Sequence, residues 1–218
     1  MMGAQLTRLV TGTLLAMALG ASAGAEVIDR VLAIVGGQVV TLSDAHAVLA
    51  LKRVDPADEP DPIGAALSYL IDRRLVLAEV DRYMPPEPDE AAIEKRIAAI
   101  RSALAPDAAF APALARVALD EARLRALARD DLRIDVYLAQ RFAALVLGDD
   151  DVERYYREHA ADFTREGVLA PLEDVRGEAR RRLAAERRTR LIAQGIAYLR
   201  RRVDVRVLYL PAKPGAPR

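Results

Sequence analysis

The sequence predicts a mainly α protein with a small β-hairpin near the N-terminus that is completed by a C-terminal strand. Three observations predict this fold class. Two apolar, β-branched runs within residues 30–42 are separated by a glycine turn, as in a hairpin. Apolar residues then recur at the three-to-four spacing of amphipathic helices as far as residue 202. Residues 203–210 alternate between apolar and polar, as a strand does.

Residues 1–25 are predicted to be a secretion signal. Arg8 precedes an apolar run from Leu9 to Leu19, and residues 20–25 are all small. Signal peptidase recognises this order of a basic start, a short apolar segment and small residues. An uncleaved membrane anchor is the alternative, but a run of roughly a dozen residues is short for a spanning helix, which needs about 20. We therefore expect an exported protein with no stable membrane span after signal removal.

Two cleavage sites fit the small-residue rule. One lies between Ala25 and Glu26, and the other between Ala23 and Gly24. We expect the first, because it leaves an acidic residue at the new N-terminus. About 190 residues then remain, enough for one domain, residues 26–210, with a core of its own.

The composition excludes several classes of protein. The chain has no cysteine, so it forms neither disulfides nor thiolate metal sites. Its 32 basic residues balance 32 acidic ones, and loss of Arg8 leaves the mature chain close to neutral. A dominant nucleic-acid or anionic-membrane role is therefore not expected.

The first elements after the signal are the hairpin and a helix. Val31–Val35 and Val39–Leu42 flank Gly36-Gly37-Gln38, which is typical of a tight turn and less so of a phosphate-binding loop. A helix should follow to about Val54, capped by Ser43 or Asp44. Residues 55–62 hold three prolines and four acidic residues, so we predict a loop there.

Helices fill most of the remaining chain. Apolar spacing predicts one helix from Ile63 that ends before Pro85, one over Asp89–Leu104 and a long one over Leu119–Leu147. Pro106 and Pro112 should interrupt the alanine-rich segment between the last two.

Gly148 should end the long helix, and Asp149–Asp151 should cap a short one that contains Tyr155 and Tyr156. The last helix is predicted over Leu172–Arg202, followed by the strand 203–210 and a disordered tail, residues 211–218. This strand can pair with the hairpin only if the two ends of the chain meet, which would make a single domain closed by its own termini.

Catalytic and metal-binding motifs are missing from the sequence. His46 and His159 lie far apart, and neither fits a zinc-binding spacing. The mature chain has no G-x-S-x-G elbow and no Walker-type or dinucleotide-type glycine motif. We therefore predict a non-enzymatic binding protein without a cofactor or metal.

Three segments have both a binding interpretation and a structural one. Asp149–Asp151 could hold calcium, but the spacing favours a helix N-terminus. The arginines of residues 176–190 could form an anion-binding stripe, but Glu178 and Glu186 favour a solvated helix with i,i+4 pairs. Tyr155, Tyr156 and Phe163 could form a client-binding patch, although helical spacing favours packing.

The segment 29–44, placed just after a signal peptide, is similar to the opening of the SurA-type periplasmic chaperones and parvulin-type prolyl isomerases. Three further blocks follow in the family order, and the helix from Leu172 with its strand resembles the segment that returns to the hairpin. The blocks are residues 70–79, 130–134 and 152–163.

In that family a parvulin domain commonly follows the block that corresponds to residues 155–163. Here that place holds only Thr164–Pro171. The resemblance therefore implies the chaperone-like module alone, a helical cradle that works without ATP and has no prolyl isomerase domain.

The resemblance implies a periplasmic chaperone that holds unfolded or extended polypeptide clients, such as outer-membrane proteins. A dedicated adaptor or structural subunit of a cell-envelope assembly complex is the alternative. Residual prolyl isomerase activity is a third, weaker hypothesis.

Overall fold

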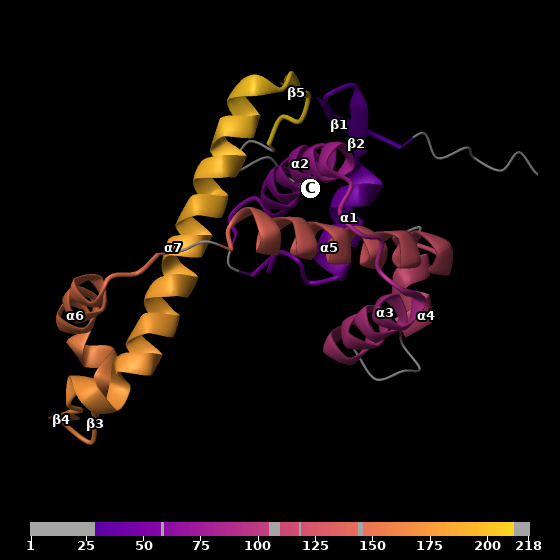
Figure 1. Ribbon diagram of the computed structural model, residues 1–218. Helices are drawn as coiled ribbons and strands as arrows, with labels where there is room; N and C mark the ends of the chain where they lie inside the picture. The colour runs from indigo at the N-terminus through magenta and orange to yellow at the C-terminus, as the bar shows by residue number, and fades with distance from the viewer. Residues whose placement is uncertain (1–28, 58, 105–109, 118, 144–145, 212–218) are drawn as a thin grey trace, which may run out of the picture.

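The computed structural model describes residues 29–57, 59–104, 110–117, 119–143 and 146–211. The fold is mainly α with a small antiparallel sheet, as predicted (Figure 1). The predicted signal and its cleavage sites lie outside the described residues, as does most of the predicted tail.

The ends of the described chain meet in one three-stranded sheet. Strand β1 (Val31–Val35) lies between β2 (Gln38–Thr41) and β5 (Val205–Val207), and both pairings are antiparallel. The backbone N–H groups of Leu208 and Tyr209 donate to the carbonyl oxygen of Leu32 at 2.8 and 3.0 Å. This confirms the predicted pairing of the C-terminal strand with the hairpin, although β5 is shorter than the predicted strand.

The turn between β1 and β2 is built by two glycines. Gly36 and Gly37 have φ of 54° and 82°. A two-residue turn with positive φ at both positions follows the twist of the flanking strands, and glycine adopts it without a Cβ clash. The tight-turn interpretation of these glycines is therefore correct.

Helix α1 (Leu42–Ala50) starts and ends differently from the prediction. Its N-cap is Thr41, whose hydroxyl accepts from the Asp44 N–H at 3.3 Å, while the Asp44 carboxylate accepts from the Thr41 N–H at 3.1 Å. This capping box satisfies two backbone donors, so the predicted cap at Ser43 or Asp44 is wrong. The helix ends at Ala50 rather than near Val54, and Lys52 beyond it has a positive φ of 49°.

The next four helices are α2 (Pro62–Tyr83), α3 (Glu90–Leu104), α4 (Phe110–Ala115) and α5 (Glu121–Arg141). Three of them agree with the prediction in order and differ at their ends, whereas α4 was not predicted and contains Pro112, which was expected to interrupt this segment. Pro62 belongs to α2 rather than to the loop, because proline is favoured in the first turn of a helix, and the Asp61 side chain accepts from the Gly64 N–H. Helix α5 ends at Arg141, well before Leu147, with Phe142 as its C-cap.

The following segment folds against a very long helix. Helix α6 (Asp149–Glu158), the 3-10 turn η2 (Ala160–Phe163) and the hairpin of β3 (Thr164–Arg165) and β4 (Val168–Leu169) precede α7 (Leu172–Arg202). The bounds of α7 are those predicted from the sequence. With 31 residues it is about 46 Å long.

The three aspartates of α6 do not cap it by a side-chain hydrogen bond. The N-cap is Gly148, which makes no such bond, and Asp149–Asp151 occupy the first turn. Their charges favour the positive end of the helix dipole. Asp149 also pairs with Arg180 at 2.5 Å and Asp151 with Arg187 at 2.8 Å, which ties α6 to α7.

The core consists of three apolar clusters rather than one. The first joins the sheet to α1, α2 and the end of α7 and includes Leu32, Val40 and Leu75. The second lies among α3, α4 and α5 and includes Ile93 and Leu124. The third joins α6, η2 and the start of α7, and it consists of Val152, Tyr155, Phe163, Val175, Ala179 and Leu183.

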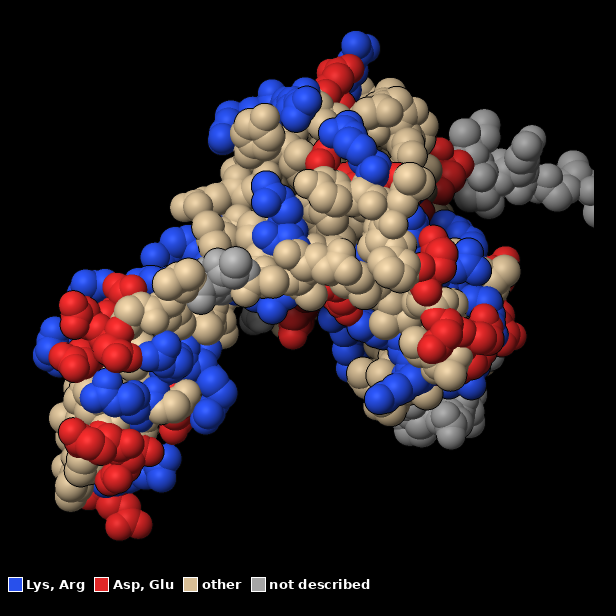
Figure 2. Space-filling view, viewed as in Figure 1, with Lys and Arg blue, Asp and Glu red and all other residues tan. Residues whose placement is uncertain are grey.

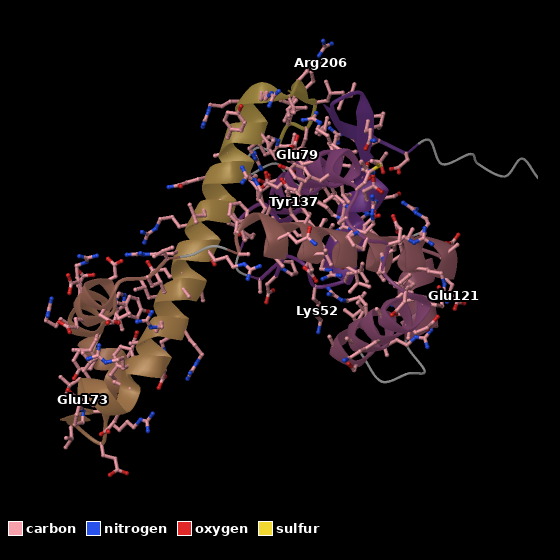
Figure 3. The ribbon with its side chains drawn as sticks, in the orientation of Figure 1. Lys52, Glu79, Glu121, Tyr137, Glu173 and Arg206 are labelled. Carbon is pink, nitrogen blue, oxygen red and sulfur yellow. The ribbon has the colours of Figure 1, made fainter. Side chains whose placement is uncertain are left out.

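Helix α7 connects the third cluster to the first. Its start packs on α6, and Leu199 and Val203 at its end pack on the first cluster. We call α6, η2, β3, β4 and the first half of α7 the arm, and the remaining elements the body. Figure 3 labels Glu173 at the far end of the arm and Arg206 at the opposite end of the molecule.

The arm projects from the body, so the molecule is not compact. Figure 2 shows a broad hollow between the arm and the part of the body that contains α3 and α4. Both sides of the hollow carry many charged side chains, whereas the centre of this face is largely uncharged.

Candidate binding pocket

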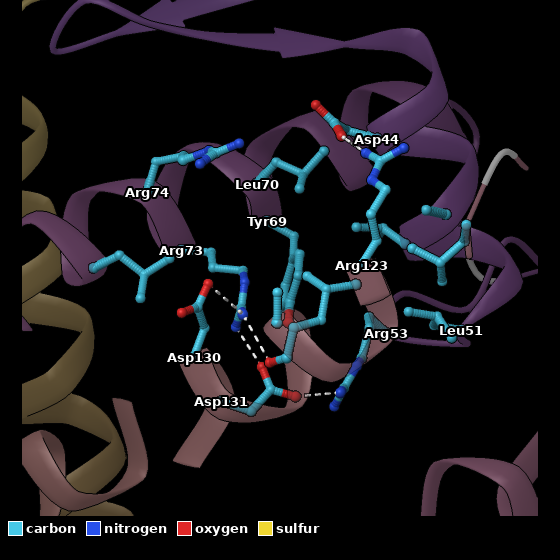
Figure 4. A pocket seen from close by; sticks show the side chains of 16 residues that line it. Asp44, Leu51, Arg53, Tyr69, Leu70, Arg73, Arg74, Arg123, Asp130 and Asp131 are labelled. Atoms are coloured by element: carbon cyan, nitrogen blue, oxygen red, sulfur yellow. Dashed lines mark hydrogen bonds and ion pairs between the residues drawn. The ribbon is translucent and has the colours of Figure 1, made fainter. Parts of the chain in front are cut away.

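A pocket of about 200 Å³ lies in the body where α1, α2 and α5 meet (Figure 4). This is less than the roughly 300–1,000 Å³ of sites for drug-sized ligands, and it suits one large side chain. Sixteen residues line it: Asp44, Ala47, Val48, Leu51, Arg53, Tyr69, Leu70, Arg73, Arg74, Leu77, Leu119, Arg123, Ala126, Leu127, Asp130 and Asp131.

Helical periodicity places these side chains on common faces. On α2, Tyr69, Arg73 and Leu77 are successive i,i+4 neighbours, and on α5 so are Arg123 and Leu127. The apolar members, mainly leucines, are buried or half-buried, except for Ala126, which is exposed. The pocket therefore has apolar walls crossed by charged side chains.

The buried carboxylate of Asp131 connects α5 to α2 and to Arg53. Asp131 on α5 is 7% exposed, and its two oxygens accept hydrogen bonds from Arg53 and from Arg73 on α2. Arg73 also donates to the Leu127 carbonyl oxygen at 3.2 Å. Two guanidinium groups thus neutralise one buried charge, which is the condition under which a charge is tolerated inside a protein.

The neighbouring carboxylate, Asp130, is less well compensated by positive charge than Asp131 is. It lies 3.8 Å from Arg73 and makes no closer pair among the described residues. Burial raises the pKa of Asp130, and the arginines Arg73 and Arg133 only partly offset that rise.

Two more arginines lie at the edge of the pocket. Arg123 on α5 pairs with Asp44 on α1 at 3.0 Å. Arg74 on α2 donates to the side-chain oxygen of Gln38 at 3.2 Å, which is a neutral partner. The lining therefore contains four arginines and three aspartates, a small excess of positive charge.

The side chains suggested earlier for client binding lie elsewhere, in the core of the arm. Tyr155 and Phe163 are 8% and 2% exposed, and Tyr156 is half-buried. The Tyr155 ring stacks on His159 with centroids 4.0 Å apart, and the Tyr156 hydroxyl donates to the Ala170 carbonyl at 2.7 Å. Burial supports the packing interpretation of these rings over an exposed patch.

The arginines of α7 are paired as the solvated-helix interpretation predicts. Arg182 pairs with Glu178 at 2.7 Å and Arg190 with Glu186 at 2.5 Å, both at i,i+4 spacing. Arg182 also lies over the Phe163 ring, 5.2 Å from its centroid. Arg182 and Arg190 are therefore paired within the helix, whereas Arg180 and Arg187 pair with aspartates of α6.

The pocket was not predicted from the sequence, although its charged doublets lie in two of the family-like blocks. Arg73-Arg74 is in residues 70–79 and Asp130-Asp131 in residues 130–134. A helix face that only packs in a core would carry apolar residues at these positions. The arginine and the aspartate interrupt the apolar pattern, and this interruption is the sequence signal that could have indicated the pocket.

Two features are absent from the described part of the chain. No group of three or more histidine, aspartate or glutamate side chains there could hold a metal ion. Within the same ranges, no helix combines the length and the apolar character needed to cross a bilayer.

Comparison with known structures places the fold. It is similar to a chain from the structures of PEB4 and Cj1289, two structurally related SurA-like chaperones of Campylobacter jejuni, with a TM-score of 0.54 and 12% identity. The match covers 83% of this chain and 100% of that chain. The chain thus has the fold of SurA-like chaperones.

Sequence comparison adds one distant relative. The chaperone for lacto-N-biosidase of Bifidobacterium longum subsp. longum is 36% identical over an alignment of 81 residues, and the match covers 30% of this chain. The match spans 28% of the length of that relative. No protein-family model matches the chain.

Proposed function

We propose that the protein is an ATP-independent chaperone of the periplasm that binds unfolded or extended polypeptides, including outer-membrane proteins. The observation that carries this proposal is the SurA-like fold, with its arm and body on either side of a hollow (Figure 2). The predicted secretion signal supports the location. In a compartment without ATP, clients must be held and released by binding free energy alone.

Exposed apolar side chains support binding to extended clients. Tyr83, Met84, Val146, Val168, Tyr198, Val207, Leu208 and Leu210 are each more than half exposed. They are distributed over the body and the arm rather than gathered at one place. Several weak apolar contacts along an extended chain suit a chaperone that must accept many sequences.

We propose further that the protein lacks prolyl isomerase activity. The eight residues Thr164–Pro171 form only the short β3–β4 hairpin between η2 and α7. In the family that the sequence resembles, the isomerase domain is inserted at this place. A hairpin of this size leaves no room for a catalytic sheet and pocket.

The test is suppression of aggregation. An unfolded outer-membrane protein diluted from urea aggregates, and light scattering follows the process. The mature protein should lower the scattering at equimolar ratio and above, while an unrelated globular protein of similar size should not. No protection at several-fold molar excess would contradict the proposal.

A dedicated partner is the second candidate function, and the relative named as a chaperone for one enzyme favours it. Purification of the tagged protein from envelope extracts separates the two. A single stoichiometric partner would indicate a dedicated chaperone or adaptor of an envelope complex, whereas many substoichiometric unfolded proteins would indicate general chaperoning.

An isomerisation assay on an X-Pro peptide tests the proposed lack of prolyl isomerase activity, because the uncatalysed reaction is slow enough to follow.

A further inference from the structure

The pocket of the body has the size and lining of a receptor for one side chain. Its walls are mainly apolar and its volume is about 200 Å³. It is too small for a helix or for a folded segment, and its apolar wall makes it a poor site for a purely polar group.

Among the residues that the structure describes, Arg74 at the pocket has no acidic partner. Arg53 and Arg73 share Asp131, and Arg123 pairs with Asp44. For Arg74 the described part of the chain supplies only the neutral side-chain oxygen of Gln38. A guanidinium group binds a carboxylate far better than an amide, because the charge-assisted bond is shorter and about twice as strong.

We propose that this pocket binds a large apolar side chain of the client, and that Arg74 binds a carboxylate next to it in the client chain. The inference rests on the proposed chaperone function and deepens it by naming the class of segment that is recognised. The carboxylate can be the C-terminus of the client or an acidic side chain, since both present the same group to Arg74.

Three labelled peptides distinguish these possibilities. All contain one leucine among glycines and serines: one ends in leucine with a free carboxylate, one has the same sequence with an amidated end, and one is amidated with glutamate beside the leucine. Fluorescence anisotropy gives their affinities for the mature protein. A partly exposed ion pair is worth about 1 kcal/mol, so either carboxylate should tighten binding about fivefold over the peptide that has neither.

Arg74→Gln tests the role of the cation. It should remove the preference for carboxylate peptides and leave the affinity of the fully neutral peptide unchanged. Arg82→Gln is the matched control on the same helix, because Arg82 is exposed, pairs with Glu79 and does not line the pocket. If Arg74→Gln lowers the affinity for all three peptides equally, Arg74 does not bind the carboxylate.

Ala126→Trp tests the pocket itself. Ala126 is exposed on α5 and lines the pocket, so a larger side chain there fills the space without entering the core. It should lower the affinity of the protein for all three peptides about tenfold or more. Ala122→Trp, at an exposed position one turn earlier and outside the lining, should leave these affinities unchanged. If Ala126→Trp fails to fold, the Arg74→Gln comparison still decides the proposal.

The outcomes separate this inference from the proposed function. If the protein suppresses aggregation but binds none of the peptides, the inference is overturned and the chaperone function stands. Stronger competition by decanoate than by the carboxylate peptides would overturn a peptide as the occupant. A preference limited to the free C-terminus or to glutamate would identify the source of the carboxylate and support the inference.

Discussion

Asp131 on α5 accepts a hydrogen bond from Arg73 on α2, although the two residues lie 58 positions apart in the sequence. Arg53, from the segment after α1, donates to the other carboxylate oxygen. The three residues form an ion network beside the pocket, with Asp131 buried, and this network connects α2 to α5.

Asp131→Asn should strongly destabilise the body. The change keeps the shape of the side chain but leaves Arg53 without a charge partner among the described residues and Arg73 with Asp130 alone, 3.8 Å away. Breaking a buried pair in this way costs about 3–5 kcal/mol. Urea unfolding followed by circular dichroism measures the loss. Asp135→Asn on the same helix is the control, because Asp135 is exposed and its pair with Arg96 should be worth at most about 1 kcal/mol. Similar small losses in both variants would show that the network does not hold the helices together.

Asp130→Asn should have the opposite effect from Asp131→Asn at neutral pH. Burial raises the pKa of Asp130, so folding favours its protonated form. This contribution to stability is present below the ordinary pKa of 3.8 and is lost as the pH rises through the higher pKa of the folded state. The variant should therefore be more stable than the natural protein at pH 7.

Urea unfolding at pH 7 and at pH 4.5 checks this expectation. The advantage of Asp130→Asn should shrink at the lower pH, because the protonated fraction of Asp130 in the natural protein rises as the pH falls toward its raised pKa. A variant that is less stable than the natural protein at pH 7 would mean that the pair with Arg73 outweighs the cost of burial.

The sequence predicted local elements much better than the pocket. Helix α7 and the hairpin were predicted well because their signals are local, namely apolar periodicity that begins after Pro171 and a glycine turn between β-branched runs. The end of α1 was missed because Lys52 adopts a positive φ that a lysine does not signal. The cap at Thr41 was missed because the neighbouring Ser43 and Asp44 are equally good N-cap residues.

The pocket depends on long-range pairing that leaves no periodic pattern. Arg53 and Asp131 are 78 positions apart, and each alone is an ordinary charged residue in a helix or turn. Tyr155 and Phe163 were considered for client binding because they are aromatic. Their burial depends on α7, which follows them in the chain.

Tyr209→Phe should weaken the closure of the chain ends at neutral pH. The Tyr209 hydroxyl donates to the Asp61 carboxylate at 2.8 Å, and Asp61 is also the N-cap of α2. Loss of this hydrogen bond should cost about 1 kcal/mol, or somewhat more because the acceptor is charged. Thermal unfolding at pH 7 measures it, and Tyr198→Phe, at an exposed position on α7, should have no effect.

The same substitution should reduce the sensitivity of the protein to alkaline pH. Burial and the hydrogen bond to Asp61 raise the pKa of Tyr209 above its ordinary value of 10.0. The stability that this gives is complete below pH 10 and is lost as the pH rises through the higher pKa of the folded protein. The difference in Tm between Tyr209→Phe and the natural protein should therefore narrow as the pH rises above 10, and a constant difference would contradict the coupling.

Gly177→Ala and Gly195→Ala should each stabilise the long helix that joins the arm to the body. Both glycines lie inside α7, where alanine is favoured over glycine by about 0.5–1 kcal/mol. A Cβ at Gly177 would lie 3.5 Å from the flexible end of Arg181, and one at Gly195 would lie 3.6 Å from the ring of Phe142. These are ordinary contact distances, so neither substitution causes a clash.

Because Gly177 lies in the arm and Gly195 beside the body, hydrogen exchange should slow near residues 172–183 in the first variant and near residues 195–202 in the second. Faster exchange in either variant would show that the glycine permits a bend that α7 needs.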